Sequence, residues 1–469
     1  LVVNGIDVII QTTADDYREV NVAYGTSATD NASMGISTSG IGSSLTLYGK
    51  LQLDEGYLTT KESGGIITNS TASGQFILNK GTVDTKQFLS LTGAASFEQN
   101  GGLFLLRGRF QRTPSAYTAV SYLQNAPLST ARANDASLTA TSGTFNLNNA
   151  NNIFIMSGGT MRIFDVCGTT APTYAFQVNS STANINVNGG TIEFVPTHGT
   201  SGSADAANHL ISTTASLSNI TINRGSGCAS TVQLNNALNI LNNLTLTAGN
   251  FNANNYDLTI GGNVSIASGT SYTPGTNTTT LNGSGTQTFT VNLATALSLN
   301  KFTIDKAAGV VVNFAGSQKT VNVTDNFRLV LGTLNDNGNT INLAKSVYNS
   351  GIHSGSGKIV LNGTTAQTID GNGIFNNLDL NNTTIGNAAP VSLMANTAVN
   401  GVLNLVSDKI FNIATYNLNI ASTGSIIATA FSNTCYIHTS GQSGDGGITK
   451  TYTSNTAFTF PVGCFSTNR

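Results

Sequence analysis

The chain has 469 residues, a formal net charge of −2 and only 9% charged residues, with 50 glycines and no tryptophan. Typical globular domains contain about 25% charged residues, and no basic stripe is present, which argues against nucleic-acid binding. No apolar run approaches the roughly 18–20 residues of a membrane span. Because 39% of the residues are apolar and lie in short alternating runs, the composition predicts an ordered all-β protein.

The first 44 residues are atypical of the chain. An apolar run, Ile6–Ile10, is followed by the charged stretch Asp15–Glu19 and by a Gly/Ser-rich run over 35–44. The first coil of a solenoid must be shielded from water and from edge pairing, and terminal units usually differ from the others. We therefore expect residues 1–44 to form an N-terminal cap, or the end of a preceding repeat.

From residue 45 onward, alternating runs repeatedly reach a glycine corner and continue as a second alternating run. The clearest copy is Ile185–Val195, which reads I-N-V-N-G-G-T-I-E-F-V. Alternation with a period of two is typical of strands, and glycine allows the positive φ that a corner needs. Corners that recur at about 20–30 residues are typical of a parallel β-helix. The general rule for parallel crossovers predicts that it is right-handed.

Two segments interrupt the alternation. The stretch Arg107–Arg132 is predicted to be an excursion from the coil, and residues 197–218 are predicted to be a loop. Binding specificity in a solenoid would reside in such interruptions. The predicted surface contacts are therefore the side chains of Arg107, Arg109, Arg112, His198 and His209.

A longer repeat begins near residue 240. Leu281–Phe289 matches Leu361–Ile369 with an offset of 80, and Asp257–Ile260 matches Thr340–Leu343 and Asn417–Ile420. A unit of about 80 residues would contain three to four coils. The sequence thus predicts a β-helix over residues 45–430, followed by a short β segment, or the start of another module, over 431–469.

Three of these motifs carry a resemblance to a known class of proteins. Leu361–Gly371 reads L-N-G-T-T-A-Q-T-I-D-G, Asn376–Leu380 reads N-N-L-D-L, and Phe458–Gly463 reads F-T-F-P-V-G. This pattern resembles the repeat-rich secreted surface proteins of the Bacteroidetes, in which an F-x-F-P-V-G strand opens the next module. The resemblance covers roughly residues 240–469. It implies export by the type IX secretion system and a place among cell-surface adhesins, including those of gliding motility.

Paired carboxylates would favour a different function, because many carbohydrate-cleaving enzymes are parallel β-helices. Acid–base hydrolysis needs two carboxylates about 5–9 Å apart. The pairs Asp15–Asp16 and Asp54–Glu55 fall in the cap and at a turn, and neighbours on a strand face opposite ways. A lyase would combine Glu193 with the arginines at 107–112, which nothing in the sequence brings together. We therefore expect no catalytic residues.

Metal ligands are sparse as well. The histidines are dispersed, and His198 and His209 share a segment without a third ligand at a recognisable spacing. Asp336, Asp370 and Asp445 stand near Gly and Asn and are the residues that would bind a structural calcium. Their spacing matches neither the EF-hand nor the glycine-rich calcium repeats. We expect neither a metal nor a cofactor.

Four cysteines stand far apart in the sequence, and none forms a C-x-x-C pair, which argues against a zinc or redox motif. Two interpretations stay open. Cys435 pairs with Cys464 and Cys167 with Cys228, or the cysteines are buried free thiols.

These observations together predict a non-enzymatic, extracellular adhesin or filament segment at the cell surface. Its expected partners are cell-surface glycans or surfaces and other secreted or secretion-system proteins, with no nucleic acid and no membrane span. A polysaccharide-active β-helix enzyme (a lyase or glycoside hydrolase) and a glycan-binding fibre module are the alternatives.

Overall fold

The structure, a computed structural model, describes residues 145–164, 173–195, 208–224, 231–440 except 387, and 446–463, together with short stretches between residues 2 and 130. Over these residues the chain consists of β-strands and one short 3-10 helix, η1 (Thr182–Asn184). The strands form a parallel β-solenoid of about 13 turns, which confirms the predicted fold class. The handedness stays a prediction.

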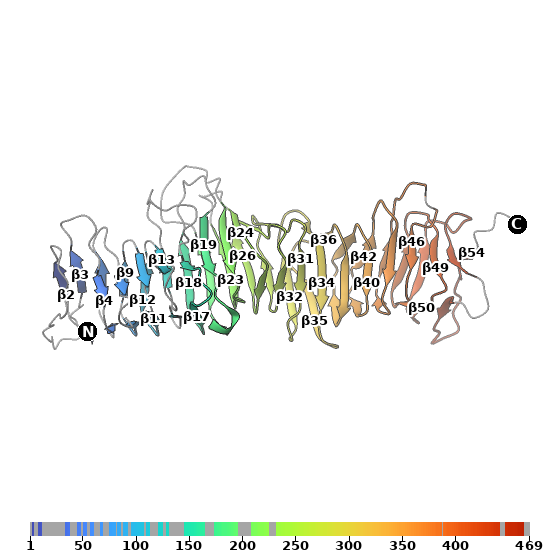
Figure 1. The fold of residues 1–469 in the computed structure, drawn as a ribbon. Coiled ribbons are helices and arrows are strands. Elements are labelled where there is room, and N and C mark those ends of the chain that lie inside the picture. Colours follow the sequence, from blue (N-terminus) through green and yellow to red (C-terminus); the bar gives the residue numbers. More distant parts are fainter. Residues whose placement is uncertain are drawn as a thin grey trace. The chain divides into compact units, whose positions relative to one another are not determined.

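The chain divides into two compact units. The first contains Leu1–Leu241 and Thr245–Asn252, and the second contains Asn242–Leu244 and Ala253–Arg469. The division falls close to the residue where the longer sequence repeat begins. The strands of each unit are stacked in sequence order in Figure 1.

In the first unit, three ladders of parallel strands run through the stack, and each strand pairs with its counterpart one coil later. The first ladder contains β5 (Lys50–Leu53), β8 (Gln75–Leu78), β11 (Ser96–Gln99), β14 (Ser121–Gln124), β17 (Ile153–Met156) and β20 (Ile185–Val187). The second contains β6 (Tyr57–Thr60), β9 (Thr82–Thr85), β12 (Leu103–Leu106), β15 (Leu128–Thr130), β18 (Thr160–Phe164), β21 (Thr191–Val195) and β23 (Asn219–Asn223). The third contains β7 (Ile66–Thr68), β10 (Phe88–Leu91), β13 (Arg109–Arg112), β16 (Phe145–Leu147), β19 (Thr173–Val178), β22 (His209–Thr213) and β24 (Thr231–Leu234).

The second unit also contains three ladders, here named D, B and E in the order in which each coil visits them. Ladder D contains β28 (Leu258–Ile260), β31 (Thr278–Leu281), β34 (Lys301–Asp305), β37 (Phe327–Leu331), β40 (Val347–Asn349), β43 (Gln367–Asp370), β46 (Val391–Leu393), β49 (Phe411–Ala414), β52 (Ile437–Thr439) and β54 (Val462–Gly463). Ladder B contains β29 (Val264–Ile266), β32 (Gln287–Val291), β35 (Val311–Ala315), β38 (Thr333–Asn335), β41 (Ile352–Ser354), β44 (Ile374–Phe375), β47 (Thr397–Val399), β50 (Leu418–Ile420) and β53 (Ile448–Lys450). Ladder E contains β33 (Leu297–Leu299), β36 (Thr320–Val323), β39 (Thr340–Leu343), β42 (Lys358–Leu361), β45 (Leu378–Leu380), β48 (Val402–Leu405) and β51 (Ser425–Ala428).

Alternation places the apolar side chains inside the coils. In β39, Ile341 and Leu343 are fully buried, while Thr340 and Asn342 are only partly covered. The in-register stacking aligns like residues, so that Phe145 pairs with Phe176 one coil later and their rings stack 5.3 Å apart. The core of each unit is therefore a column of side chains that runs along the stack.

The 80-residue repeat does not contain a whole number of coils. Its matching strands are β28, β39 and β50, which lie eleven strands apart and belong to ladders D, E and B in turn. Since each coil contributes three strands, one repeat advances three and two-thirds coils. This agrees with the predicted three to four coils, and it moves each copy of a motif to a different ladder.

Two sequence expectations differ from the structure. The predicted excursion at 107–132 contains β13, β14 and β15, which pair within the ladders. The predicted loop at 197–218 contains β22, whose five residues are all buried, so no polar alternation marks it. Within 431–469, β54 includes the end of the F-x-F-P-V-G motif and pairs with β52 of the same unit. Within the predicted cap, the described strands β2 (Val8–Gln11) and β3 (Ser33–Ser37) pair in parallel, and β3 pairs with β6.

Candidate functional site

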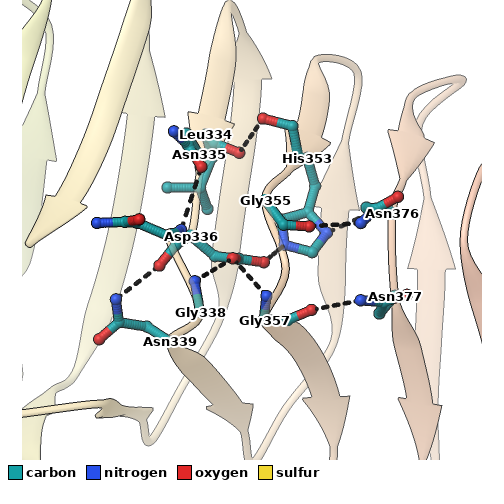
Figure 2. A network of polar contacts seen from close by, with 12 residues as sticks. Leu334, Asn335, Asp336, Gly338, Asn339, His353, Gly355, Gly357, Asn376 and Asn377 are labelled. Atoms are coloured by element: carbon teal, nitrogen blue, oxygen red, sulfur yellow. Dashed lines mark hydrogen bonds and ion pairs between the residues drawn. The ribbon is translucent and has the colours of Figure 1, made fainter.

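A buried polar cluster inside the second unit centres on Asp336, which lies in the turn before β39 (Figure 2). The same turn occurs in the other two copies of the repeat, where Ala253 and Ile413 stand in place of Asp336. All three residues are fully buried. The next residue in each copy has a positive φ, near 50°, at Asn254, Asn337 and Ala414. Asp336 thus occupies a position that the other copies fill with an apolar side chain.

His353 supplies the other half of the cluster from the next coil. It lies on β41, where the register pairs it with the buried Leu334, and its ring contacts that of Phe375 on β44. His353 therefore stands in an otherwise apolar column. A polar ring in such a column requires a hydrogen-bond partner at the same depth.

The carboxylate of Asp336 is that partner. His353 Nε2 lies 2.8 Å from Asp336 Oδ2, and both side chains have no exposed surface. Asp336 Oδ1 accepts hydrogen bonds from the amides of Gly338 at 2.9 Å and Gly357 at 2.7 Å. Gly355, with a φ of 108°, passes so close that a Cβ there would collide with the carboxylate. The turn is built around this one acidic group.

The hydrogen bonds also assign the tautomer of His353. Its Nδ1 faces the backbone amide of Asn376 at 3.3 Å, and an amide N–H can only donate. The ring proton is therefore on Nε2 and is donated to Asp336. An aspartate next to a histidine is the arrangement that prepares a general base, but here both ring nitrogens are occupied and the pair is buried. The pair joins two coils and has no atom available to a substrate.

Side-chain amides extend the same cluster along the stack. Asn376 Nδ2 donates to the carbonyl of Gly355, and Asn377 Nδ2 donates to that of Gly357 at 2.7 Å. Asn339 Nδ2 donates to the carbonyl of Asp336 at 2.6 Å. Two turn carbonyls are thereby satisfied by the adjoining coil, and a third is satisfied within its own turn.

The L-N-G-x-x-x-Q-T motif has a comparable structural role. Gln367 is fully buried, and its Nε2 donates to the carbonyls of Leu343 and Lys345 in the preceding coil, both at 2.8 Å. Gln287, the matching residue of the earlier copy, donates in the same way to the carbonyls of Ile260 and Gly262. The glutamine of this motif is conserved between the two copies because it bridges two coils at a corner.

A second pair of equivalent residues covers the same corner. Lys306 Nζ donates to the carbonyls of Gly283 at 2.6 Å and Gly285 at 3.2 Å. In the later copy Asn382 takes this place, and its Nδ2 donates to the carbonyl of Thr365 at 2.7 Å. Lys306 is 3% exposed. It is therefore a buried amine, and the hydrogen-bond acceptors of its Nζ are neutral carbonyls.

The free energy of unfolding is expected to depend on pH through the titration of Lys306. Burial lowers the pKa of this amine from 10.5 to about 8, so between these values the unfolded chain binds a proton that the folded chain lacks. The contribution of Lys306 to the free energy of unfolding should therefore rise as the pH rises from 8 to 10.5. Urea titrations of the native chain and of Lys306→Met across this range measure it. Parallel pH profiles for the two proteins would contradict the expectation.

Among the residues predicted as surface contacts, His209 is the one whose side chain the structure describes. His209 lies on β22 and is fully buried, so the predicted exposed loop histidine is wrong. His198 and Arg107 lie outside the described residues. Arg109 and Arg112 lie at the ends of β13, and their side chains are also outside the described part. His438 is half-buried beside Asn412, and burial lowers its pKa.

Asp336, Asp370 and Glu193, which the sequence singled out, form hydrogen bonds or ion pairs within the fold. Both Asp336 oxygens accept from N–H groups, so this carboxylate, named above as a residue that would bind a structural calcium, is hydrogen-bonded within the fold. Asp370 accepts from the amide of Gly371. Glu193 forms an ion pair with Arg162 at 2.8 Å and accepts from Asn223. Among the described residues no group of three or more His, Cys, Asp or Glu could hold a metal ion. The pairs Asp15–Asp16 and Asp54–Glu55, and Asp445, lie outside them.

Cys435 is a buried free thiol, as in the second of the two interpretations left open for the cysteines. Cys464, Cys167 and Cys228 lie outside the described residues. Burial, together with the negative charge of Asp408 and a hydrogen bond to it, raises the pKa of the Cys435 thiol.

Cys435 should consequently react slowly with alkylating reagents, because the thiolate is the reactive form. We expect iodoacetamide at neutral pH to label Cys435 at least about tenfold more slowly in the folded protein than in urea. Peptide mass spectrometry after timed labelling measures the two rates. Equal rates would show that the thiol is open to solvent.

The outward faces, in contrast, carry neutral side chains in register. Asn335 donates to Asn313 one coil earlier at 3.0 Å, and Asn342 donates to Asn322 at 2.9 Å. In the first unit Asn179 donates to Asn148 at 2.8 Å. Each amide in such a ladder keeps donors and acceptors for water or for a ligand. Charged side chains interrupt these rows in several places, including the ion pairs Arg162–Glu193 and Lys358–Asp379. Another is Arg328, whose guanidinium lies 4.4 Å from the centre of the Tyr348 ring.

No helix in the described part of the chain has the length and apolar character that a membrane crossing requires. Comparisons with models of protein families, with curated proteins and with solved structures found no match to this chain.

Proposed function

We propose that this chain is a non-enzymatic adhesive or filament segment of a secreted cell-surface protein, with glycans or other surfaces as its partners. The observation that carries the proposal is the division of polar groups. The chemically versatile residues, such as Asp336, His353 and Lys306, are buried between coils, whereas the outward rows consist largely of amides and hydroxyls.

Such rows suit adhesion for a physical reason. Amide ladders such as Asn313–Asn335 and Asn322–Asn342 repeat at the strand spacing of about 4.8 Å. Sugar hydroxyls are recognised by amides and hydroxyls that both donate and accept hydrogen bonds. A weak contact that is repeated along a stack gains strength through multivalency.

The resemblance of Leu361–Gly371, Asn376–Leu380 and Phe458–Gly463 to repeats of Bacteroidetes surface adhesins supports an extracellular place for this proposal. Export by the type IX system, contacts with other secreted proteins and a link to gliding motility are parts of the same proposal. Antibody labelling of intact source cells tests the location. Labelling only after the cells are broken would refute it.

A glycan array combined with a cleavage assay tests the function itself. We expect the purified chain to bind a subset of glycans without releasing reducing ends or unsaturated products. Release of such products would instead identify a glycoside hydrolase or a lyase. Binding that persists after substitution of outward asparagines, such as Asn335→Ala with Asn342→Ala, would move the contact away from the amide ladders.

A further inference from the structure

Asparagine–glycine pairs stand at many corners of the coils, and their backbone amides are not equivalent. In seven such pairs within the described residues, the asparagine is exposed. In six of them the glycine N–H donates a hydrogen bond, to a carbonyl one coil earlier or to a buried side chain. These six are Asn100–Gly101, Asn188–Gly189, Asn337–Gly338, Asn362–Gly363, Asn372–Gly373 and Asn400–Gly401.

The seventh pair, Asn282–Gly283, differs. Within the part of the chain that the structure describes, the Gly283 N–H donates to no hydrogen bond. Its counterpart in the next repeat has the same local sequence, L-N-G, and there the Gly363 N–H donates to Gln367 Oε1 at 2.9 Å. The difference therefore arises from the surroundings of the two corners and not from the pair itself.

The two corners also differ in a neighbouring residue. Asn382 donates to Gln367 Oε1 at 2.8 Å, and so this oxygen accepts from both Asn382 and Gly363. Lys306 stands in place of Asn382 in the earlier copy and bonds the carbonyl of Gly283 instead. Gln287 Oε1 is buried and has no hydrogen-bond partner within the described residues. Within the described residues, the amide of Gly283 and Gln287 Oε1 therefore both lack a hydrogen-bond partner.

A free amide after asparagine has a chemical consequence. Its nitrogen can attack the side-chain Cγ of the asparagine, which forms a C–N bond and closes a five-membered succinimide while the side-chain nitrogen leaves as ammonia with the amide proton. Water then opens the ring to aspartate or isoaspartate. Glycine permits the attack because it has no Cβ to obstruct it, and asparagine is for this reason a thermolabile residue. A hydrogen bond from the glycine N–H must break before the nitrogen can react.

We propose that Asn282 is a site of spontaneous deamidation in the folded protein, whereas the other described Asn-Gly corners are protected by their glycine hydrogen bonds. The modification adds one negative charge. As isoaspartate it also adds one main-chain carbon at the corner between β31 and β32. The site requires no enzyme and no cofactor, and it is independent of the proposed adhesive function.

The test compares Asn282 with Asn362 in one sample. The folded chain is incubated in mildly alkaline buffer, samples are quenched over time, and peptide mass spectrometry measures aspartate and isoaspartate at each position. We expect Asn282 to react roughly tenfold faster than Asn362, a factor comparable to the net strength of one hydrogen bond. In urea the two sites should react at similar rates. Equal rates in the folded protein would overturn the proposal.

Exchanging the neighbouring residues provides matched variants. Lys306→Asn should supply the donor that Asn382 provides in the other copy, and should slow Asn282 to the rate of Asn362. Asn382→Lys should accelerate Asn362 in return. Gly283 cannot be substituted, because a Cβ there would collide with the carbonyl of Gly261. If circular dichroism shows that one variant does not fold, the other variant still tests the proposal. Unchanged deamidation rates in a folded variant would refute the role of residues 306 and 382 at these corners.

Discussion

Replacing Asp336 with alanine is expected to lower the free energy of unfolding of the second unit by about 3–5 kcal/mol. The change removes the acceptor for His353 Nε2 and for the amides of Gly338 and Gly357. The His353 ring and the amide of Gly357 are in the interior, where water cannot replace the lost oxygen without opening the turn, whereas Gly338 is exposed. A donor that loses its partner while buried costs far more than the hydrogen bond contributes when it is made. Urea titration and hydrogen exchange at the amides of β38 to β42 measure the loss.

The double variant Asp336→Ala with His353→Leu is the matched control. It makes the position resemble the other copies of the repeat, which have Ala253 and Ile413 there, and it removes the polar ring along with its partner. Replacing a buried pair by apolar groups is often close to neutral. We expect the double variant to be more stable than Asp336→Ala alone, with the amides of Gly338 and Gly357 accounting for the remaining loss. A double variant that is less stable than the single one would contradict this.

The eleven-strand repeat limits how the second unit can present a binding surface. Because β28, β39 and β50 belong to ladders D, E and B, equivalent residues of successive copies point in different directions around the coil axis. The repeat therefore cannot build one continuous stripe of identical contacts. It does build similar corners, and this explains why the motif residues that match between copies, such as Gln287 and Gln367, are bridges between coils.

Much of this fold could be predicted because alternation and glycine corners are local properties. In Ile185–Val195 the pattern predicted two strands around a corner, and the structure has β20, a positive φ at Gly190 and β21 with Ile192 and Phe194 buried. The strand β22 could not be found in this way. All five of its residues are buried, the polar ones included. Polar and apolar residues therefore do not alternate along it as they do along a strand with one exposed face.

The Asp336–His353 pair was missed for a related reason. His353 pairs across a register that depends on coil length, and this length varies: Thr320 pairs with Thr340 and then Lys358, but Leu378 pairs with Leu403. No fixed spacing connects the two residues in the sequence. A signal did exist, since aligning the three copies places Asp336 with Ala253 and Ile413. A single acidic residue in an apolar column implies a buried partner.

The second large effect is expected in the first unit, where Phe145→Ala should cost about 3–5 kcal/mol. The ring of Phe145 stacks between those of Phe110 at 4.9 Å and Phe176 at 5.3 Å, and the edge contact to Phe154 is 5.9 Å. The register pairs Phe110 with Phe145 and Phe145 with Phe176, so the column cannot close the gap without shifting strands. Urea titration of the variant and hydrogen exchange over β13 to β19 measure the loss.

Two controls separate packing volume from ring stacking. Phe145→Leu retains an apolar side chain and should cost about 1–2 kcal/mol, because it loses ring contacts and leaves a smaller cavity. Asn146→Ala changes the next residue on the same strand, which is only partly buried, and should shift stability by less than about 1 kcal/mol. A coil in a solenoid is supported mainly by its neighbours, so the increased exchange in Phe145→Ala should be greatest at β13, β16 and β19. A uniform increase over the whole unit would show instead that its coils unfold as one block.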